Sequence, residues 1–267
     1  DNDMIGSNGV TQLSNGNYVI SSTAWTNGNI LGAGALTWAD DSIGVSGAVS
    51  SVNSLVGSQE GDSIGSGTYS VGLITLSNGN YLVNSSYWDN GSAVDAGAVT
   101  WGDGETGVAG VVSSSNSLVG SSTRDSWANR ITLLSNGNYV VLNSFWDNGS
   151  NLGAGAVTWG DGTTGITGVI SSSNSLVGSK SSDIVGYGGI VELANGNYVV
   201  RSYKWNNGTQ WDAGAATWAD GTIGITGIVS STMITTTKEN LVIELREFLE
   251  CFFRTFDISN EIPIDAN

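Results

Sequence analysis

The sequence predicts an all-β protein of four tandem repeats, followed by a C-terminal segment of different composition. The string LSNGNYVI recurs with small changes at Leu13, Leu76, Leu134 and Leu193, at spacings of 63, 58 and 59 residues. The chain of 267 residues contains 39 Gly and one Pro, and its β-branched residues alternate with Gly and Asn, which is typical of strands and tight turns. Few strong helix formers occur before residue 232.

Each copy keeps a fixed internal register. A first Trp follows ten residues after the first Asn of the string, and a second Trp follows thirteen residues later. The first set is Trp25, Trp88, Trp146 and Trp205, and the second set is Trp38, Trp101, Trp159 and Trp218. All length variation lies between the later string LVGS and the next NGN. Constant register with one variable connection predicts compact supersecondary units joined by a surface loop.

Within one copy we expect four strands, which in the second copy are 71–76, 81–88, 96–101, and 110–114 running toward Leu118 and Val119. The Asn-Gly pair between the first two predicts a hairpin with a type I′ turn, because both of its central residues need positive φ. Asp-Gly after the second Trp predicts a similar reversal.

A repeated four-stranded antiparallel unit of about this length matches the blade of a β-propeller. We therefore expect a four-repeat propeller over residues 1–231, with blades at approximately 1–58, 59–121, 122–179 and 180–231. The competing architecture is a β-solenoid, whose coils are usually shorter, roughly 20 to 30 residues. Closing the ring, within one chain or between chains, would remove exposed sheet edges.

The strings LVGS…DSIGSG, LxNGNYVV and AGAVTW together resemble the FG-GAP repeats of integrin-α-type propellers. The full pattern NGNYVV…WDNG…GAVTW…NSLVGS is also similar to repeat arrays in bacterial filamentous-haemagglutinin-like surface proteins. These resemblances cover residues 1 to about 231. They imply a propeller fold and an extracellular or cell-surface location on a bacterium.

Two departures from the FG-GAP pattern matter. The calcium-binding loop of that family carries a run of Asp, whereas the equivalent loop here is Ser14-Asn15-Gly16-Asn17, so the family's metal site is expected to be absent. In the third copy, Asp125-Ser126-Trp127-Ala128 replaces the opening Gly, so that blade is expected to open differently.

The segment 232–267 breaks the repeat and contains four of the five Phe residues. Apolar residues recur there at helical spacing, and 236–239 reads as a capping box, so we expect an amphipathic helix over about 238–256. Its apolar residues include Leu241, Leu245, Phe248, Leu249, Phe252 and Phe256. Such a face is expected to pack as an end cap on the repeats, or to mediate oligomerisation through Leu241, Leu245, Phe248, Phe252 and Phe256.

Composition restricts the chemistry. The chain has no His and a single Cys, which excludes Ser-His-Asp and Cys-His catalysis, imidazole metal sites and an internal disulfide. A net charge of −16 opposes binding to nucleic acid and to anionic membranes. The acids Asp40, Asp103, Asp161 and Asp220 recur once per repeat, where turn chemistry explains them. We therefore expect no enzyme activity.

The repeated Trp residues are the strongest candidates for ligand contact, because an exposed indole beside Asn and Asp is a common platform for sugars. The candidate site residues are Trp25, Trp88, Asp89, Asn90, Trp146, Asp147, Asn148, Trp205, Asn206 and Asn207. The alternative is that these Trp fill the space between repeats, and for the second set we favour that alternative.

Four near-equal copies suit multivalent binding or a scaffold better than one asymmetric catalytic site. The sequence thus predicts a non-enzymatic adhesin or lectin-like module that binds a carbohydrate or cell-surface ligand. A structural stalk or fibre repeat, assembled as a homo-oligomer through the C-terminal helix, is the alternative. No cofactor is expected, although calcium at Asp40 and Asp41, or at Asp103 and Glu105, remains a candidate ion.

Overall fold

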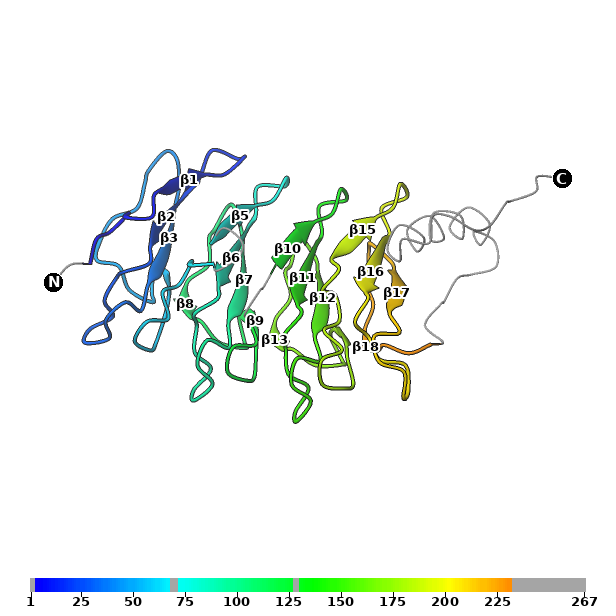
Figure 1. The fold of residues 1–267 in the computed structure, drawn as a ribbon. Coiled ribbons are helices and arrows are strands. Elements are labelled where there is room, and N and C mark those ends of the chain that lie inside the picture. Colours follow the sequence, from blue (N-terminus) through cyan, green and yellow to red (C-terminus); the bar gives the residue numbers. More distant parts are fainter. Residues whose placement is uncertain (1–2, 68–71, 127–129, 232–267) are drawn as a thin grey trace.

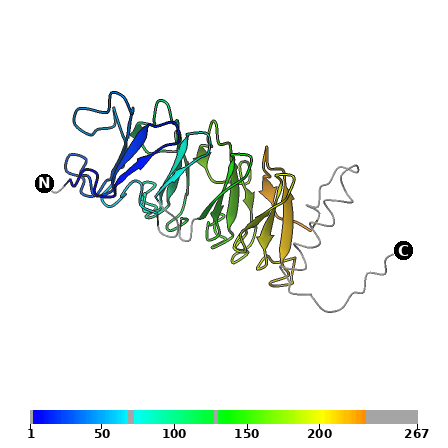
Figure 2. The same cartoon turned by 90° about the horizontal axis from the view of Figure 1, so that it is seen from above.

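The computed structural model describes residues 3–67, 72–126 and 130–231, which form four β-sheets in an open row (Figure 1). We number the repeats 1 to 4 in chain order and call the contact between consecutive repeats a joint. Repeats 1 and 4 lie at opposite ends of the row in both views (Figure 2). This corrects the expectation of a closed propeller, since the repeats stack face to face in one direction.

Three strands of each repeat form an antiparallel meander, joined in the order of the chain. They are β1 (Val10–Gln12), β2 (Tyr18–Ser22) and β3 (Ala35–Ala39) in repeat 1, β5 (Leu73–Thr75), β6 (Tyr81–Ser85) and β7 (Ala98–Gly102) in repeat 2, β10 (Arg130–Leu133), β11 (Tyr139–Asn143) and β12 (Ala156–Gly160) in repeat 3, and β15 (Ile190–Glu192), β16 (Tyr198–Ser202) and β17 (Ala215–Ala219) in repeat 4. The first three expected strands are thus confirmed, with shorter bounds.

The fourth expected strand is divided into two, and its halves serve different sheets. In repeat 2, β9 (Ser117–Val119) pairs with β7 of its own sheet, whereas β8 (Gly110–Val111) pairs in parallel with β4 (Leu55–Val56) of repeat 1. The same exchange joins β13 (Gly168–Val169) to β9 and β18 (Gly227–Ile228) to β14 (Leu176–Val177). Each of the first three repeats therefore has a five-stranded sheet completed by its successor.

The hairpin turn at NGN differs from the expected type I′. In repeat 1 the N–H of Leu13 donates to Asn17 O at 2.7 Å, which leaves three loop residues, and only Gly16 among them has positive φ, 101°. Asn15 instead accepts the N–H of Asn17 through its side-chain oxygen at 3.2 Å. A three-residue loop that ends on a left-handed Gly is the next most common hairpin connection.

The apolar cores lie between repeats. The core of joint 1 combines Leu13, Leu36 and Leu55 of repeat 1 with Tyr81 and other buried residues of repeat 2. Joints 2 and 3 have equivalent clusters. The meanders of repeats 2 and 3 thus bury one face against the preceding repeat and the other against the following repeat, which is how stacked repeat proteins gain stability.

Repeat 4 ends the described row with a three-stranded sheet. The expected C-terminal helix and its apolar residues lie outside the described residues. In the part of the chain that the structure describes, no helix combines the length and hydropathy needed to span a membrane.

Candidate functional site

The most distinctive site in the structure is a clamp on one glycine carbonyl at each joint. At joint 1 the carbonyl of Gly104, in the turn after β7, accepts hydrogen bonds from Asn15 Nδ2 at 2.8 Å, Asn17 Nδ2 at 2.8 Å and Trp38 Nε1 at 3.0 Å. All three donors belong to repeat 1. Two amides and one indole thus hold a backbone oxygen of the following repeat.

The same clamp recurs at the other two joints. At joint 2 the donors to Gly162 O are Asn78, Asn80 and Trp101, at 2.8, 3.0 and 3.1 Å. At joint 3 the donors to Gly221 O are Asn136, Asn138 and Trp159, at 2.7, 3.0 and 3.0 Å. The NGN string and the second Trp, which define the repeat in the sequence, are therefore the parts of this clamp.

In repeats 1 to 3 the second Asn of NGN serves two repeats at once. Asn80 accepts the N–H of Gly104 in its own repeat at 2.9 Å through Oδ1, while its Nδ2 donates to repeat 3. Gly is needed at the held position, since a Cβ on Gly104 would lie 2.1 Å from Gly79 O. A Cβ on Gly107 would lie 2.6 Å from the Cβ of Trp38, so the turn packs directly on the indole.

A buried carboxylate forms a second polar element at each joint. Asp62 is fully buried, and its Oδ2 accepts the N–H groups of Ser58 and Gln59 at 2.7 and 2.8 Å. Its Oδ1 accepts the N–H of Asp89 at 2.9 Å. Asp62 thus fastens the variable connection to the WDNG turn of repeat 2.

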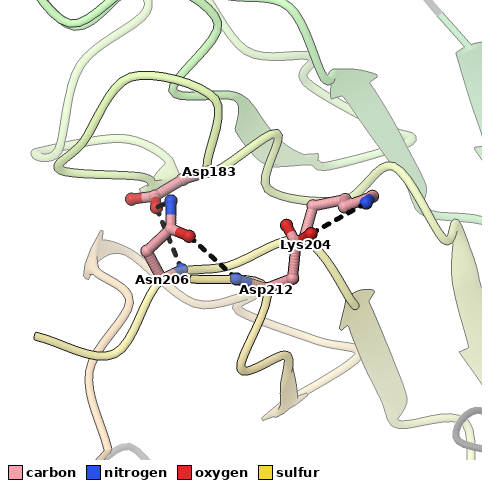
Figure 3. Close-up of polar contacts among 4 residues, drawn as sticks. All are labelled: Asp183, Lys204, Asn206 and Asp212. Carbon is pink, nitrogen blue, oxygen red and sulfur yellow. Dashed lines mark hydrogen bonds and ion pairs between the residues drawn. The ribbon is translucent and has the colours of Figure 1, made fainter. Parts of the chain in front are cut away.

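Asp125 and Asp183 have the same role at joints 2 and 3. Burial raises the pKa of Asp62 and of Asp125 above the usual Asp value, although three backbone N–H groups oppose that shift in each case. At joint 3, Asn206 replaces the Asp of the turn and donates both its N–H and its Nδ2 to Asp183, at 3.1 and 2.9 Å (Figure 3). Its Oδ1 accepts the N–H of Asp212 at 2.9 Å.

The first set of Trp residues lies in the interior. Trp25, Trp88, Trp146 and Trp205 are 4% to 7% exposed, and the last three belong to the cores of joints 1, 2 and 3. The indole N–H groups of these three are also buried and have no hydrogen-bond partner among the described residues. In this conformation the indole faces are not available as sugar platforms. Ligand binding at these turns remains a prediction, and it would need either contacts that do not involve the indoles or an opening of the turn.

The polar candidates of the turns are engaged within the protein. Asn90 and Asn148 donate to the carbonyls of Gly120 and Gly178 at 2.8 and 2.9 Å. The side chain of Asp89 accepts the N–H of Asp95 at 2.8 Å. The remaining polar candidates Asp147 and Asn207 also close the turn, through Gly153 N and through paired backbone bonds with Gln210. These contacts give each residue a structural role.

The once-per-repeat acids cap their turns, as the sequence indicated. Asp161 accepts the Thr163 hydroxyl and two backbone N–H groups, and the hydroxyl is the largest cause that lowers the pKa of Asp161. Asp40, Asp103 and Asp220 cap equivalent turns. Within the described ranges, no group of three or more Asp, Glu, Cys or His residues could hold a metal ion. The two pairs of acids considered for calcium, Asp40 with Asp41 and Asp103 with Glu105, therefore gain no third acidic ligand there.

The sequence did not predict the roles of two sets of residues, namely the Asn side chains of the clamp and the buried Asp of each joint. The signal for the Asp was present, because Asp62, Asp125 and Asp183 each follow the Gly of LVGS by five residues while the rest of the connection varies. By contrast, three members of the second Trp set fill the space between repeats, as predicted, namely Trp38, Trp101 and Trp159, whereas Trp218 packs on residues of its own repeat.

Comparison with known protein families identifies four tandem repeats in the chain. A family model described as "Repeat of unknown function (DUF5650)" matches residues 12–66, 75–129, 133–187 and 192–240. No curated protein matches the chain. Since the four matches cover well over half of the sequence, the chain belongs to this repeat family.

Proposed function

We propose that this member of the DUF5650 repeat family is a non-enzymatic structural module, an extended row of repeats that sets a fixed distance between the parts attached to it. The supporting observation is the use of the repeated residues. At all three joints the clamp consists of the two Asn of NGN and the second Trp of one repeat, which hold the Gly that follows the second Trp in the next repeat. The pattern common to the copies is therefore explained by contacts between repeats.

The joints also have the properties of a stiff connection. Each combines an apolar core, a parallel strand pair, a three-donor clamp and a buried Asp. The clamp carbonyl and the buried Asp each accept several hydrogen bonds, and buried polar groups that are satisfied in this way favour one geometry over its competitors. A row held in this way would resist bending at every repeat.

Small-angle X-ray scattering of the full chain at low concentration tests the proposed shape. A compact protein of 267 residues has a radius of gyration of about 18 Å. We expect a clearly larger value and the scattering profile of a rigid rod. A radius close to that of a compact globule, or the profile of a flexible chain, would contradict the proposal.

The second candidate function is multivalent adhesion at the bacterial surface, including lectin-like binding, which one observation favours. The sixth residue after each first Trp is a large apolar residue that is between 49% and 75% exposed. These residues are Leu31, Val94, Leu152 and Trp211. One exposed apolar side chain per repeat gives weak contacts that can add through avidity.

A glycan array, probed with calcium and with chelator, separates the two functions. Saturable binding to related sugars that is weakened by Leu152→Glu would support adhesion. A blank array under both conditions, together with rod-like scattering, would support the structural module.

A further inference from the structure

The end of repeat 4 exposes residues that every internal joint buries. Ala33, Ala96 and Ala154 are fully buried at joints 1, 2 and 3, whereas the equivalent Ala213 is exposed. Ala216 is partly exposed, although its counterparts in the other repeats are buried apolar residues. This end therefore presents the first half of a joint.

The clamp at this end has a donor without an acceptor. Trp38, Trp101 and Trp159 each donate to a glycine carbonyl of the next repeat. The indole N–H of Trp218 is buried and has no hydrogen-bond partner in the part of the chain that the structure describes. An unsatisfied buried donor loses its hydrogen bond to water without replacing it, so a carbonyl at this position would be stabilising.

The end of repeat 1 presents the other half of a joint. Ile64 and Val185 are fully buried, whereas the equivalent Ile5 is 54% exposed. Val45 is 39% exposed, while its counterpart Val108 packs against the core of the preceding repeat. The apolar residues that fill each internal joint from the following repeat thus face solvent here.

We propose that copies of this chain associate head to tail, with the repeat 1 end of one copy on the repeat 4 end of another. The backbone groups are complementary. At joint 1 the N–H groups of Ser63 and Ile64 donate to Gly32 O and Ala33 O at 2.9 and 3.2 Å. The equivalent donors at the repeat 1 end are those of Met4 and Ile5, and the equivalent acceptors are the carbonyls of Asp212 and Ala213.

This contact would be weaker than an internal joint for two reasons. Asp41 stands where the clamped Gly is found in the other repeats, so the carbonyl offered to Trp218 carries an added side chain beside it. The residues equivalent to Leu55 and Val56 of β4 are Thr235 and Thr236, which lie outside the described residues, so the sequence has two polar residues where the internal joints have a buried apolar pair. Association should therefore depend on concentration, and a head-to-tail contact of this kind extends into open filaments unless its rotation closes a ring.

Sedimentation equilibrium of the full chain tests the proposal, at 0.3 M salt, which screens the repulsion between copies of net charge −16. We expect the mean mass to rise with concentration. Ala213→Glu and Ile5→Glu should each lower the association constant at least tenfold, because each places a charge in the contact. Ser114→Glu adds the same charge at an exposed site in repeat 2, away from both ends, and should leave association unchanged.

A mixture of the two end variants identifies the geometry. The Ile5→Glu copy retains an intact repeat 4 end and the Ala213→Glu copy retains an intact repeat 1 end, so the mixture should form dimers and nothing larger. A wild-type chain that stays monomeric up to 1 mM would overturn the proposal. So would association that both end variants leave intact, which would place the contact elsewhere, such as in residues 232–267.

This inference rests on the proposed structural role, and the two can fail separately. A monomeric chain with rod-like scattering would remove the head-to-tail contact and retain the structural module. Compact or flexible scattering from a chain that still associates would contradict the module alone.

Discussion

The clamp predicts that the second Asn of NGN stabilises two repeats at once. Replacing Asn80 by Ala removes the hydrogen bond from Nδ2 to Gly162 O across joint 2 and leaves the N–H of Gly104 without its acceptor. The matched control is Asn197→Ala in repeat 4. The structure describes for that side chain the equivalent bond to Gly221 N and no bond to a following repeat.

The difference between the two variants isolates the contact across the joint. A net contribution of about 1 kcal/mol is expected for the neutral hydrogen bond to Gly162 O. The stranded N–H adds about 1 to 2 kcal/mol in both variants. Asn80→Ala should therefore destabilise its repeat by about 2 to 3 kcal/mol and Asn197→Ala by about 1 to 2 kcal/mol.

Hydrogen exchange followed by mass spectrometry measures these losses locally, since proteins open in local units as well as globally. Peptides covering β6 should lose protection about 30- to 150-fold in Asn80→Ala, and peptides covering β16 about 5- to 30-fold in Asn197→Ala. Equal losses at the two sites would refute the reasoning, because the amide would then contribute nothing across the joint.

Three further predictions concern the glycines and the buried acids of the joints. Gly165→Ala should cost about 2 to 4 kcal/mol, because the residue has φ of 74° and its Cβ would lie 2.5 Å from the Cβ of Trp101. Gly149→Ala, with similar φ and open space around it, should cost only about 1 to 2 kcal/mol, so similar thermal unfolding midpoints would contradict the packing of turn on indole. Asp125→Asn should lower the free energy of unfolding, measured in urea, by about 2 kcal/mol. The two oxygens of Asp125 accept three N–H groups, and an Asn side chain has only one oxygen that can accept. An unchanged urea midpoint would contradict a stabilising role for these hydrogen bonds. The pKa values of Asp62 and Asp125 are raised, so the folded state binds protons more readily than the unfolded state. The urea midpoint of unfolding should therefore rise as the pH falls from 7 toward the ordinary Asp pKa. A steady fall of the midpoint over that range would show that other groups dominate.

The sequence predicted the local structure well. The expected strands 81–88 and 96–101 correspond to β6 and β7, because alternation of apolar and polar residues and Gly-rich turns are local signals. The turn type at NGN was wrong because Asn15 and its equivalents use their side chains to bond within the loop, which sets the backbone differently from a two-residue hairpin.

The arrangement of the repeats was not predictable in the same way. A four-stranded unit can close into a ring or stack in a row, and the choice depends on where the segment 110–114 finds its partner. In the structure β8 leaves its own sheet to pair with β4, a contact between distant residues for which the sequence carries no periodic signal. For a related reason the sequence could not decide whether the first Trp of each repeat is a sugar platform or a core residue. Repeated Trp residues have the same pattern whether they face a ligand or the next repeat.

The sharing of each core by two consecutive repeats has a consequence for how such arrays change over time. The three large apolar clusters each combine two consecutive repeats, so the smallest piece that retains one of them is a pair of neighbours. Any two repeats that carry the same clamp and the same buried Asp can become neighbours. Loss or duplication of a whole repeat in the gene would therefore leave every contact satisfied, and the length of the row could vary without any compensating point mutation.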